Sequence, residues 1–310
     1  MDAVTIYRTH ELQTPGPMEQ AAAWIEALDL KPRTREAYRK NIGYYLAWLS
    51  AHGLRGTSRA DVLAYKEHLT ATYEAATVSA YLTAVRTFYA WLSITYSVPD
   101  IARGIKGARQ PRGFRKDPLT ADQVKAVLSA VDRDAPDGLR DYAILSLMSH
   151  TGIRVVEVQR ADICDIRQVM GRSVLFVQGK GRDEKDEFVI LSPLVLRAIA
   201  AYIRSRGETL DADAPLFVSS SDRNRGGRLS TRSLSRIVKQ KFQEAGMDSA
   251  KLTAHSLRHT AITLALVGGA TVQQAQAMAR HANINTTMIY AHNLDRAKNK
   301  CEATIAAAIL

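Results

Sequence analysis

Apolar residues recur at intervals of three and four along most of the chain, which is the pattern of helices that bury one face. Four such stretches lie in the first hundred residues, and they predict helices over residues 18–30, 32–53, 58–70 and 77–94. Pro32 and Ser58 suit helix starts, and Gly53 suits a helix end. Because helices joined by short connections pack into a compact bundle, this part of the chain is expected to form a small helical domain.

From residue 118 onward, stretches of helical period alternate with short apolar runs. Thr120 can cap a helix, and further helices are expected over residues 139–148, 192–206 and 234–245. Three short strands are expected at 163–166, 173–178 and 187–191. Later helices are expected around residues 255–267, at 272–278 and from Leu294 to Ile309. The whole chain is therefore predicted to be mainly α, with a mixed α+β second domain that contains a small three-stranded antiparallel sheet.

The segment between these two regions, residues 108–117, differs from both in composition. It contains Pro111 and Gly113 and has a net charge of +3, whereas residues 1–107 have a net charge of +2. This composition predicts an extended basic linker. Such a linker either lies along a phosphate backbone or is a solvated hinge.

The overall composition narrows the class of partner. The 310 residues have a formal net charge of +11, which favours a polyanion: nucleic acid is the first candidate and an anionic membrane surface the second. No apolar run approaches the roughly 20 residues that span a bilayer, and the amino terminus has no signal-peptide pattern. We therefore expect a cytoplasmic protein. Cys164 and Cys301 have no metal-site spacing and are interpreted as packing residues.

The densest chemistry lies between Thr253 and His292. His255 and Arg258 are three residues apart, so they share one face of a helix. An arginine fork binds phosphate oxygens, a histidine exchanges protons near neutral pH, and a tyrosine can form covalent intermediates. An anionic phosphoryl centre attacked by a phenol would use all three. Each residue alone also has an ordinary structural interpretation: a satisfied histidine, a surface ion pair or a half-buried ring.

The segments HSLRH (255–259) and RHANINTTMIYAH (280–292) resemble the carboxy-terminal motifs of the tyrosine recombinase (phage integrase) family. TGIRVVEV (151–158) resembles the first arginine motif of the same family, with Glu157 able to hold Arg154 in place and Val156 in place of a small polar residue. GKGRDEKD (179–186) resembles the hairpin that carries the family's lysine. Lys180 matches best, and Lys185 is the alternative. Arg280 stands where many members have glycine.

TREAYRKNIGYYLAWLSAHG and ATVSAYLTAVRTFYAWL resemble the family's helical core-binding domain. The resemblance implies a SAM-like helical domain followed by a catalytic domain of the DNA breaking-rejoining type. It assigns residues 1–17 to an extension, 18–107 to the core-binding domain, 108–117 to the linker and 118–292 to the catalytic domain. Residues 293–310 would form a helix that docks on a neighbouring protomer. The extension is too short for an arm-binding domain.

The resemblance also implies a mechanism. Tyr290 would attack a DNA phosphodiester, leaving a 3′-phosphotyrosine and a free 5′-hydroxyl that can be resealed without ATP, metal or cofactor. Its partners would be double-stranded DNA, three further protomers in a tetramer that forms a Holliday junction, and in some systems accessory DNA-bending proteins. Arg154, Arg258 and His281 would bind the phosphate, Lys180 would protonate the leaving oxygen, and His255 would handle the proton of Tyr290.

Basic residues outside this group are candidates for phosphate contacts. They lie on the outward face of the first domain, in the linker and in the polar loop 219–232: Arg33, Arg35, Arg39, Lys40, Arg86, Arg112, Arg115, Lys116, Arg225, Arg228 and Arg232.

Three alternatives remain at this stage. A metal site on His255 and His259 is disfavoured by the absence of a glutamate in HSLRH and by the charge of Arg258. A DNA-binding regulator without activity is disfavoured because every expected catalytic residue is present. A type IB topoisomerase shares the chemistry, and the tyrosine nine residues after His281 favours a recombinase over it. His259 and His292 are left as structural or DNA-facing residues.

Overall fold

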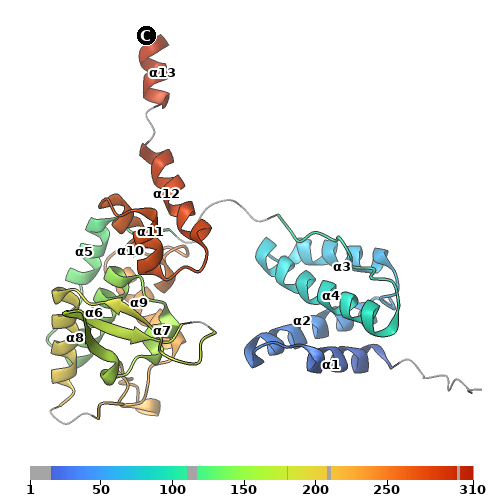
Figure 1. Cartoon of the computed structure of the whole chain (residues 1–310), viewed down its shortest axis with the longest axis horizontal. Helices are drawn as coiled ribbons and strands as arrows, with labels where there is room; N and C mark the ends of the chain where they lie inside the picture. The colour runs from blue at the N-terminus through green and yellow to red at the C-terminus, as the bar shows by residue number, and fades with distance from the viewer. Residues whose placement is uncertain (1–14, 110–116, 180, 208–210, 299–300, 310) are drawn as a thin grey trace, which may run out of the picture. The chain divides into compact units, whose positions relative to one another are not determined.

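The chain divides into two compact units, Met1–Arg112 and Gly113–Leu310 (Figure 1). The computed structural model describes residues 15–109, 117–179, 181–207, 211–298 and 301–309. Within these ranges the chain is mostly helical, with one three-stranded sheet in the second unit. The predicted fold class is confirmed.

The first unit is a bundle of α1 (Pro17–Ala27), α2 (Pro32–Ala51), α3 (Arg59–Thr72) and α4 (Ala75–Tyr96). Helix α4 packs against the other three. Trp24 is fully buried, and its ring lies 5.4 Å from that of Phe88. The hydroxyls of Tyr45 and Tyr89 are 2.9 Å apart, and Tyr89 donates to the carbonyl oxygen of Gly56 at 2.7 Å. These contacts satisfy the polar ends of two core rings, so the predicted bundle has a fully packed interior.

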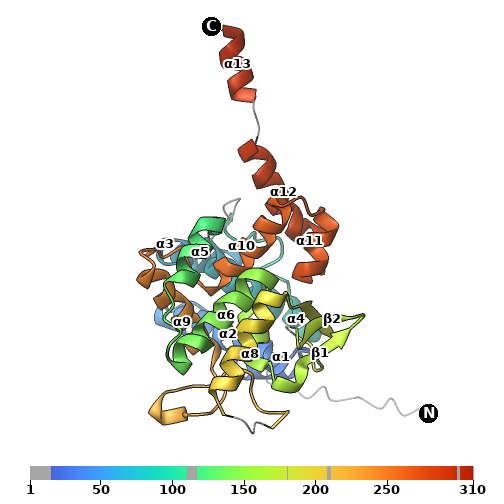
Figure 2. The same cartoon turned by 90° about the vertical axis from the view of Figure 1, so that its left-hand side faces the viewer.

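The second unit is built around α6 (Pro136–Thr151), where every residue from Ala143 to Ser149 is buried. It packs against α5 (Ala121–Ser129), α8 (Pro193–Ser205), α9 (Thr231–Glu244) and α10 (Ala254–Val267). Figure 2 shows the sheet and α9 on opposite sides of α6. A helical segment that is buried on every face needs neighbours on every side, which explains this central position.

The sheet has the order β1 (Ile166–Val169), β2 (Arg172–Val177) and β3 (Glu187–Ile190), with both pairs antiparallel. Leu175 and Val177 face the core. The prediction of a strand at 163–166 was wrong, because residues Ile163–Asp165 form a 3₁₀ turn and the strand starts at Ile166. The carboxylate of Asp165 accepts from the backbone N–H of Asp162 at 2.7 Å, which stabilises the turn.

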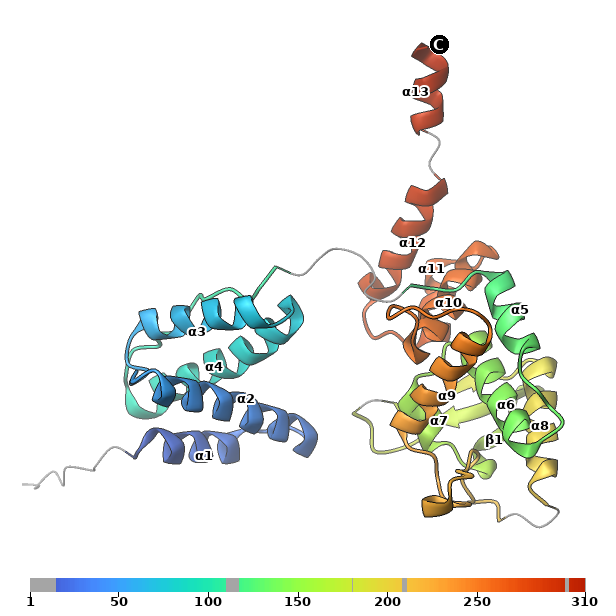
Figure 3. The ribbon, with the colours of Figure 1, turned by 180° about the vertical axis from the view of Figure 1, so that it is seen from behind.

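The carboxy-terminal part comprises α10, α11 (Val272–Ala279), α12 (Ile284–Lys298) and α13 (Cys301–Ile309). Helices α10, α11 and α12 contact one another, as Figure 3 also shows. The prediction of a single last helix starting at Leu294 was wrong at its start. Helix α12 begins at Ile284, because the side chain of Asn283 accepts from the backbone N–H of Asn285 at 2.9 Å and caps the first turn. Tyr290 therefore lies on a helix.

Among the described residues, no helix is both long enough and apolar enough to cross a bilayer.

Thr260 on α10 fixes the start of the second unit. Its buried hydroxyl accepts from the backbone N–H of Leu119 at 2.8 Å and donates to the carbonyl of Ser256 at 2.8 Å. We expect Thr260→Val to lower the free energy of unfolding of this unit by about 1–3 kcal/mol, because the N–H of Leu119 is left unpaired in the interior. Urea unfolding followed by circular dichroism measures this.

The control is Ser235→Ala, which removes an exposed hydroxyl that donates to the carbonyl of Thr231 in α9. We expect it to change the free energy of unfolding by less than about 0.5 kcal/mol. Equal effects of the two substitutions would contradict the role assigned to Thr260.

Candidate active site

Arg154 lies at a sharp turn between two helices. Gly152 ends α6 in the left-handed conformation, with φ of 63°, and Arg154 then caps α7 (Val155–Arg160). The carboxylate of Glu157 accepts from the backbone N–H of Arg154 at 2.8 Å and from its Nη1 at 2.8 Å. Glu157 is fully buried. The expectation that Glu157 holds Arg154 is confirmed.

Arg258 joins three helices through one buried guanidinium. Its Nη1 donates to the carbonyl of Gly152 at the end of α6, and its Nη2 donates to the carbonyl of Ala279 at the end of α11, both at 2.5 Å. Burial, together with the neighbouring Arg154 and Arg280, lowers the pKa of Arg258 to about 10. The side chain stays charged at neutral pH and is held by the electronegative ends of two helices.

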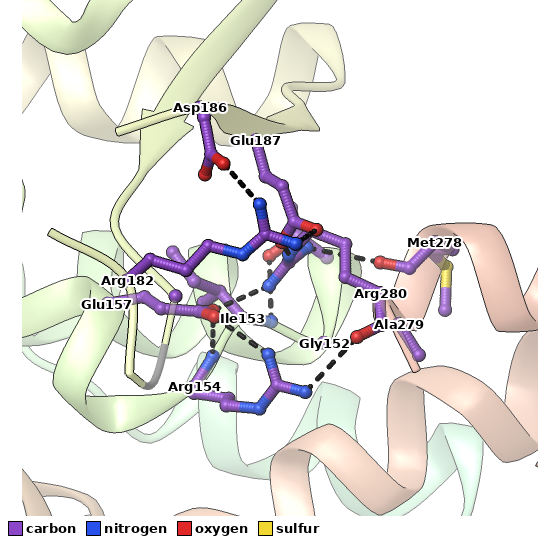
Figure 4. Close-up of polar contacts among 12 residues, drawn as sticks. Gly152, Ile153, Arg154, Glu157, Arg182, Asp186, Glu187, Met278, Ala279 and Arg280 are labelled. Atoms are coloured by element: carbon purple, nitrogen blue, oxygen red, sulfur yellow. Dashed lines mark hydrogen bonds and ion pairs between the residues drawn. The ribbon is translucent and has the colours of Figure 1, made fainter. Parts of the chain in front are cut away.

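The turn that follows α11 brings the remaining phosphate-binding candidates together. Arg280 ends the helix in the left-handed conformation, and its carbonyl accepts from Nη2 of Arg154 at 3.3 Å (Figure 4). The next residue, His281, forms a hydrogen bond of 2.8 Å from Nδ1 to the hydroxyl of Thr287 on α12. Arg154, Arg258 and His281, which are far apart in the sequence, thus meet at the carboxyl end of α11.

Tyr290 lies next to these residues, on α12. Its hydroxyl is 2.5 Å from Nδ1 of His259, and its ring centroid is 6.4 Å from that of His281. The side chain is only 4% exposed. The family resemblance assigns the proton of Tyr290 to His255, yet the imidazole that touches the phenol belongs to His259. The ring of His255 packs edge-on against His259, with 4.5 Å between centroids.

The titration behaviour of this cluster follows from burial. Burial, helped by the cations and histidines around them, lowers the pKa values of His259 and His281 to about 4. Burial also raises the pKa of Tyr290 to about 12, although Arg258 opposes this shift. Both imidazoles are therefore neutral at pH 7 and the phenol keeps its proton. A neutral Nδ1 that carries no proton can accept the hydrogen bond of the phenol.

His255 lies in the first turn of α10. Partial burial, together with Arg258 and Arg154, lowers its pKa. His255 and Arg258 share a helix, as expected, but the guanidinium of Arg258 turns inward to the two carbonyls described above. His292 is exposed on α12.

The structure describes only one of the two hairpin lysines. Lys180 lies outside the described residues. Lys185 binds Asp162 at 2.7 Å and also pairs with Asp165. Although burial opposes the shift, these two carboxylates raise the pKa of Lys185. An ammonium held by two carboxylates is a structural link, so Lys185 fastens the hairpin to the turn at Asp162–Asp165.

The basic residues of the first unit are partly engaged within their own chain. Arg35 donates to the carbonyl of Leu28 at 3.1 Å, and Arg39 pairs with Glu36 and Glu26. Arg86 donates to the carbonyl of Ile105 at 3.2 Å and to Thr83. Arg33 and Lys40 are exposed on α2.

In the polar loop, Arg225 and Arg232 are exposed, and Arg225 pairs with Asp222 at 3.1 Å. Arg228 instead donates to the carbonyls of Gln159 and Ala161 and pairs with Asp162. These contacts indicate that Arg228 fastens the loop to α7. Arg112, Arg115 and Lys116 lie outside the described residues.

Two residues of the cluster have contacts that the sequence did not predict. His259 was expected to be structural or DNA-facing, and its i, i+4 spacing from His255 also places both rings on one face of α10. Thr287 had no signal, because its role depends on the turn that brings His281 back onto α12.

Comparison with known proteins supports an architecture of a helical N-terminal domain followed by a second domain. Residues 118–297 match the model of the phage integrase family, and residues 18–95 match that of the phage integrase N-terminal SAM-like domain. The chain is 33% identical over 291 residues to tyrosine recombinase XerC of Pelobacter propionicus, covering 90% of this chain and 92% of that protein. It is 31% identical over 279 residues to tyrosine recombinase XerD of Ralstonia nicotianae, covering 87% of each.

Among solved structures, the fold resembles that of the XerH site-specific recombinase in a post-cleavage complex with a palindromic difH substrate. The TM-score is 0.72 at 19% identity, covering 92% of this chain and 85% of that one. A lambda integrase dimer bound to a COC′ core site has a TM-score of 0.67 at 16% identity, covering 87% and 95%.

The lowered pKa values of His259 and His281 predict a pH dependence of stability. The unfolded chain binds protons on these residues below pH 6.5, whereas the folded chain resists protonation until about pH 4. Their contribution to stability is present above pH 6.5 and is lost as the pH falls toward 4. We expect the free energy of unfolding of the second unit to fall over this range, and His259→Gln to make the fall shallower.

Urea unfolding at a series of pH values measures this dependence. Ser235→Ala, which leaves every titratable group of the same unit in place, is the control and should keep the wild-type slope. An unchanged slope in His259→Gln would show that His259 binds protons equally in both states.

Proposed function

The chain belongs to the phage integrase family and is a tyrosine-type site-specific recombinase; we propose that Tyr290 is its nucleophile and that it exchanges DNA strands through a 3′-phosphotyrosyl intermediate. The observation that carries this proposal is the meeting of Arg154, Arg258 and His281 beside Tyr290. Two guanidiniums and an imidazole gathered at one turn, with a phenol on the adjoining helix, suit a phosphodiester, whose charge grows on the non-bridging oxygens in the transition state.

In the proposed cleavage step, the phenol oxygen of Tyr290 bonds to the scissile phosphorus. The bond from phosphorus to the 5′-oxygen breaks, and that oxygen leaves as a hydroxyl after taking a proton. Lys180 is the proposed donor of that proton. The 3′-phosphotyrosyl ester retains the energy of the broken bond, so a 5′-hydroxyl from another strand can reverse the step without ATP.

The proton of Tyr290 has a nearby acceptor in His259. The phenol and Nδ1 are 2.5 Å apart, within the range needed for transfer. With a pKa of about 4, His259 is a weak base, and the pKa of about 12 makes Tyr290 a reluctant acid. Both values describe the chain without DNA. A phosphate that pairs with Arg258 and Arg154 would remove part of the positive charge near His259 and make it more basic.

The proposed substrate is double-stranded DNA, contacted through Arg33, Lys40, Arg225 and Arg232 among others, with the basic linker along the backbone. The helical domain, residues 18–107, and the catalytic domain, residues 118–292, are each proposed to contact the duplex. Four protomers acting in pairs would pass through a Holliday junction, with accessory DNA-bending proteins as further partners.

The burial of Tyr290 has a consequence for activation. A side chain that is 4% exposed cannot be reached by a phosphate until α12 shifts. The chain after Tyr290 continues through α12 to α13, where Ile305 and Ile309 are 57% and 79% exposed. We propose that α13 docks on a neighbouring protomer. Docking would bury these side chains and shift α12.

The cleavage proposal predicts that Tyr290→Phe forms no covalent adduct. The substrate is a duplex selected for binding to this protein, nicked just 3′ of the cleavage point so that the 5′-hydroxyl fragment diffuses away. The variant lacks the attacking oxygen, so the adduct should fall by at least about 10³-fold on a denaturing gel. Tyr142→Phe, in the same unit, should react like the wild type. With two uncut sites, the wild type should also form four-way junctions.

Adduct formation by Tyr290→Phe at the wild-type rate would exclude this tyrosine as the nucleophile. Nicking and resealing without four-way junctions would instead indicate a topoisomerase-like activity.

The docking proposal predicts that Ile305→Ser combined with Ile309→Ser weakens assembly on DNA that carries two sites. Full burial of one isoleucine contributes about 1.5–3 kcal/mol, so each loss should weaken protomer association by roughly 10-fold to 100-fold. Sedimentation of the protein–DNA complex measures this. Ile94→Ser, which changes an isoleucine that is 85% exposed on α4, is the control. Wild-type assembly by the double variant would contradict docking through α13.

A further inference from the structure

A row of alternating charges connects the sheet to the turn that carries Arg154 (Figure 4). Neighbouring members of the row are linked by ion pairs, and the five residues come from three segments that are distant in the sequence. In order from the hairpin inward, the members are Arg182, Glu187, Arg280, Glu157 and Arg154.

Arg280, at the centre of the row, has a backbone conformation that its side chain does not favour. Its φ of 54° and ψ of 50° lie in the left-handed region, where the Cβ of an L-residue is crowded against the following carbonyl. Glycine takes this conformation without that crowding and is the usual residue after a helix end. The arginine side chain must therefore contribute something that offsets the strain.

The side chain of Arg280 places a positive charge in a buried position. The side chain of Arg280 is 5% exposed. Its Nη2 lies 2.5 Å from the carboxylate of Glu157, its Nη1 donates to the carbonyl of Met278 at 3.2 Å, and its Nε lies 3.6 Å from the carboxylate of Glu187. A buried guanidinium with these neighbours has its position fixed on three sides.

Glu157 connects Arg280 to Arg154. Its side chain is fully buried and receives two arginines, Arg154 on one oxygen and Arg280 on the other. With Arg154 alone, Glu157 would form a closed one-to-one pair whose charges cancel. With Arg280 as a second cation, the carboxylate is shared, and Arg154 retains more of its attraction for an anion in front of it.

The backbone of the same turn sets the direction of both arginines. The carbonyl of Arg280 accepts from Arg154, and the carbonyl of the preceding Ala279 accepts from Arg258. A displacement of this turn would therefore misplace both guanidiniums at once.

We propose that Arg280 is a positioning residue for the recombinase reaction: through Glu157 it holds Arg154 in place and keeps the site positively charged toward the scissile phosphate. This inference rests on the proposed cleavage chemistry. Arg280 does not touch the reacting atoms; it acts through the carboxylate that it shares with Arg154.

The first test compares Arg280→Gly, Arg280→Met and Arg280→Lys in single-turnover cleavage at saturating DNA. Gly relieves the backbone strain and removes the charge, Met keeps the strain and removes the charge, and Lys keeps both. We expect Gly and Met to slow cleavage by about 10–100-fold, as is typical when a residue that orients a site residue is lost, while DNA affinity changes less. Lys should recover part of the rate.

The second test uses a substrate with a methylphosphonate at the scissile position. This group is neutral, so its cleavage depends less on positive charge held by Arg154. The deficits of Arg280→Gly and Arg280→Met should shrink several-fold on this substrate. A purely structural defect would slow both substrates equally. Circular dichroism confirms that each variant is folded, and the binding control is DNA affinity. Met170→Gly relieves a left-handed residue elsewhere in the same unit, with φ of 48°, and should cleave like the wild type.

The outcomes separate the two proposals. If the wild type forms no adduct, the cleavage chemistry fails and this inference fails with it. If the wild type forms the adduct and Arg280→Gly reacts at the same rate, only the role of Arg280 is overturned. Equal deficits on the charged and the neutral substrate would likewise overturn it.

Discussion

The buried guanidinium of Arg258 is the contact on which the active site depends. A cation in the interior requires acceptors, and Arg258 finds them in the carbonyls of Gly152 and Ala279, at the carboxyl ends of α6 and α11. The first carbonyl belongs to the turn that leads to Arg154, and the second to the turn that leads to His281. One side chain on α10 thereby brings together two segments that are more than a hundred residues apart.

The same burial explains the protonation states of the titratable side chains in the site. Low solvent access and nearby cations keep His259 and His281 neutral and keep Tyr290 protonated. The chain without DNA is thus at rest, with its phenol hydrogen-bonded to His259 and covered. An incoming phosphate would supply the anion that the arginines lack and would alter the proton balance among these groups.

The sequence was most informative where the signal is local. Helical periodicity predicted most of the helices, and the resemblance of the motifs to a known family grouped Arg154, Arg258, His281 and Tyr290. Prediction failed where the outcome depends on capping or on tertiary contacts. Asp165 converts the expected start of β1 into a 3₁₀ turn, and Asn283 starts α12 ahead of Tyr290. Whether His255 or His259 faces the phenol depends on where α12 crosses α10, which spacing along one helix does not determine. The sequence showed Arg280 in place of a glycine but did not show its partners Glu157 and Glu187, because these come from α7 and β3.

The most direct measurement is to locate the DNA on the protein after trapping. Digestion of the adduct with trypsin and nuclease, followed by mass spectrometry, should find the phosphate remnant on residues 281–296, a peptide whose only tyrosine is Tyr290. The released strand should carry a 5′-hydroxyl. A remnant on any other peptide, or a 5′-phosphate on the released strand, would contradict the account.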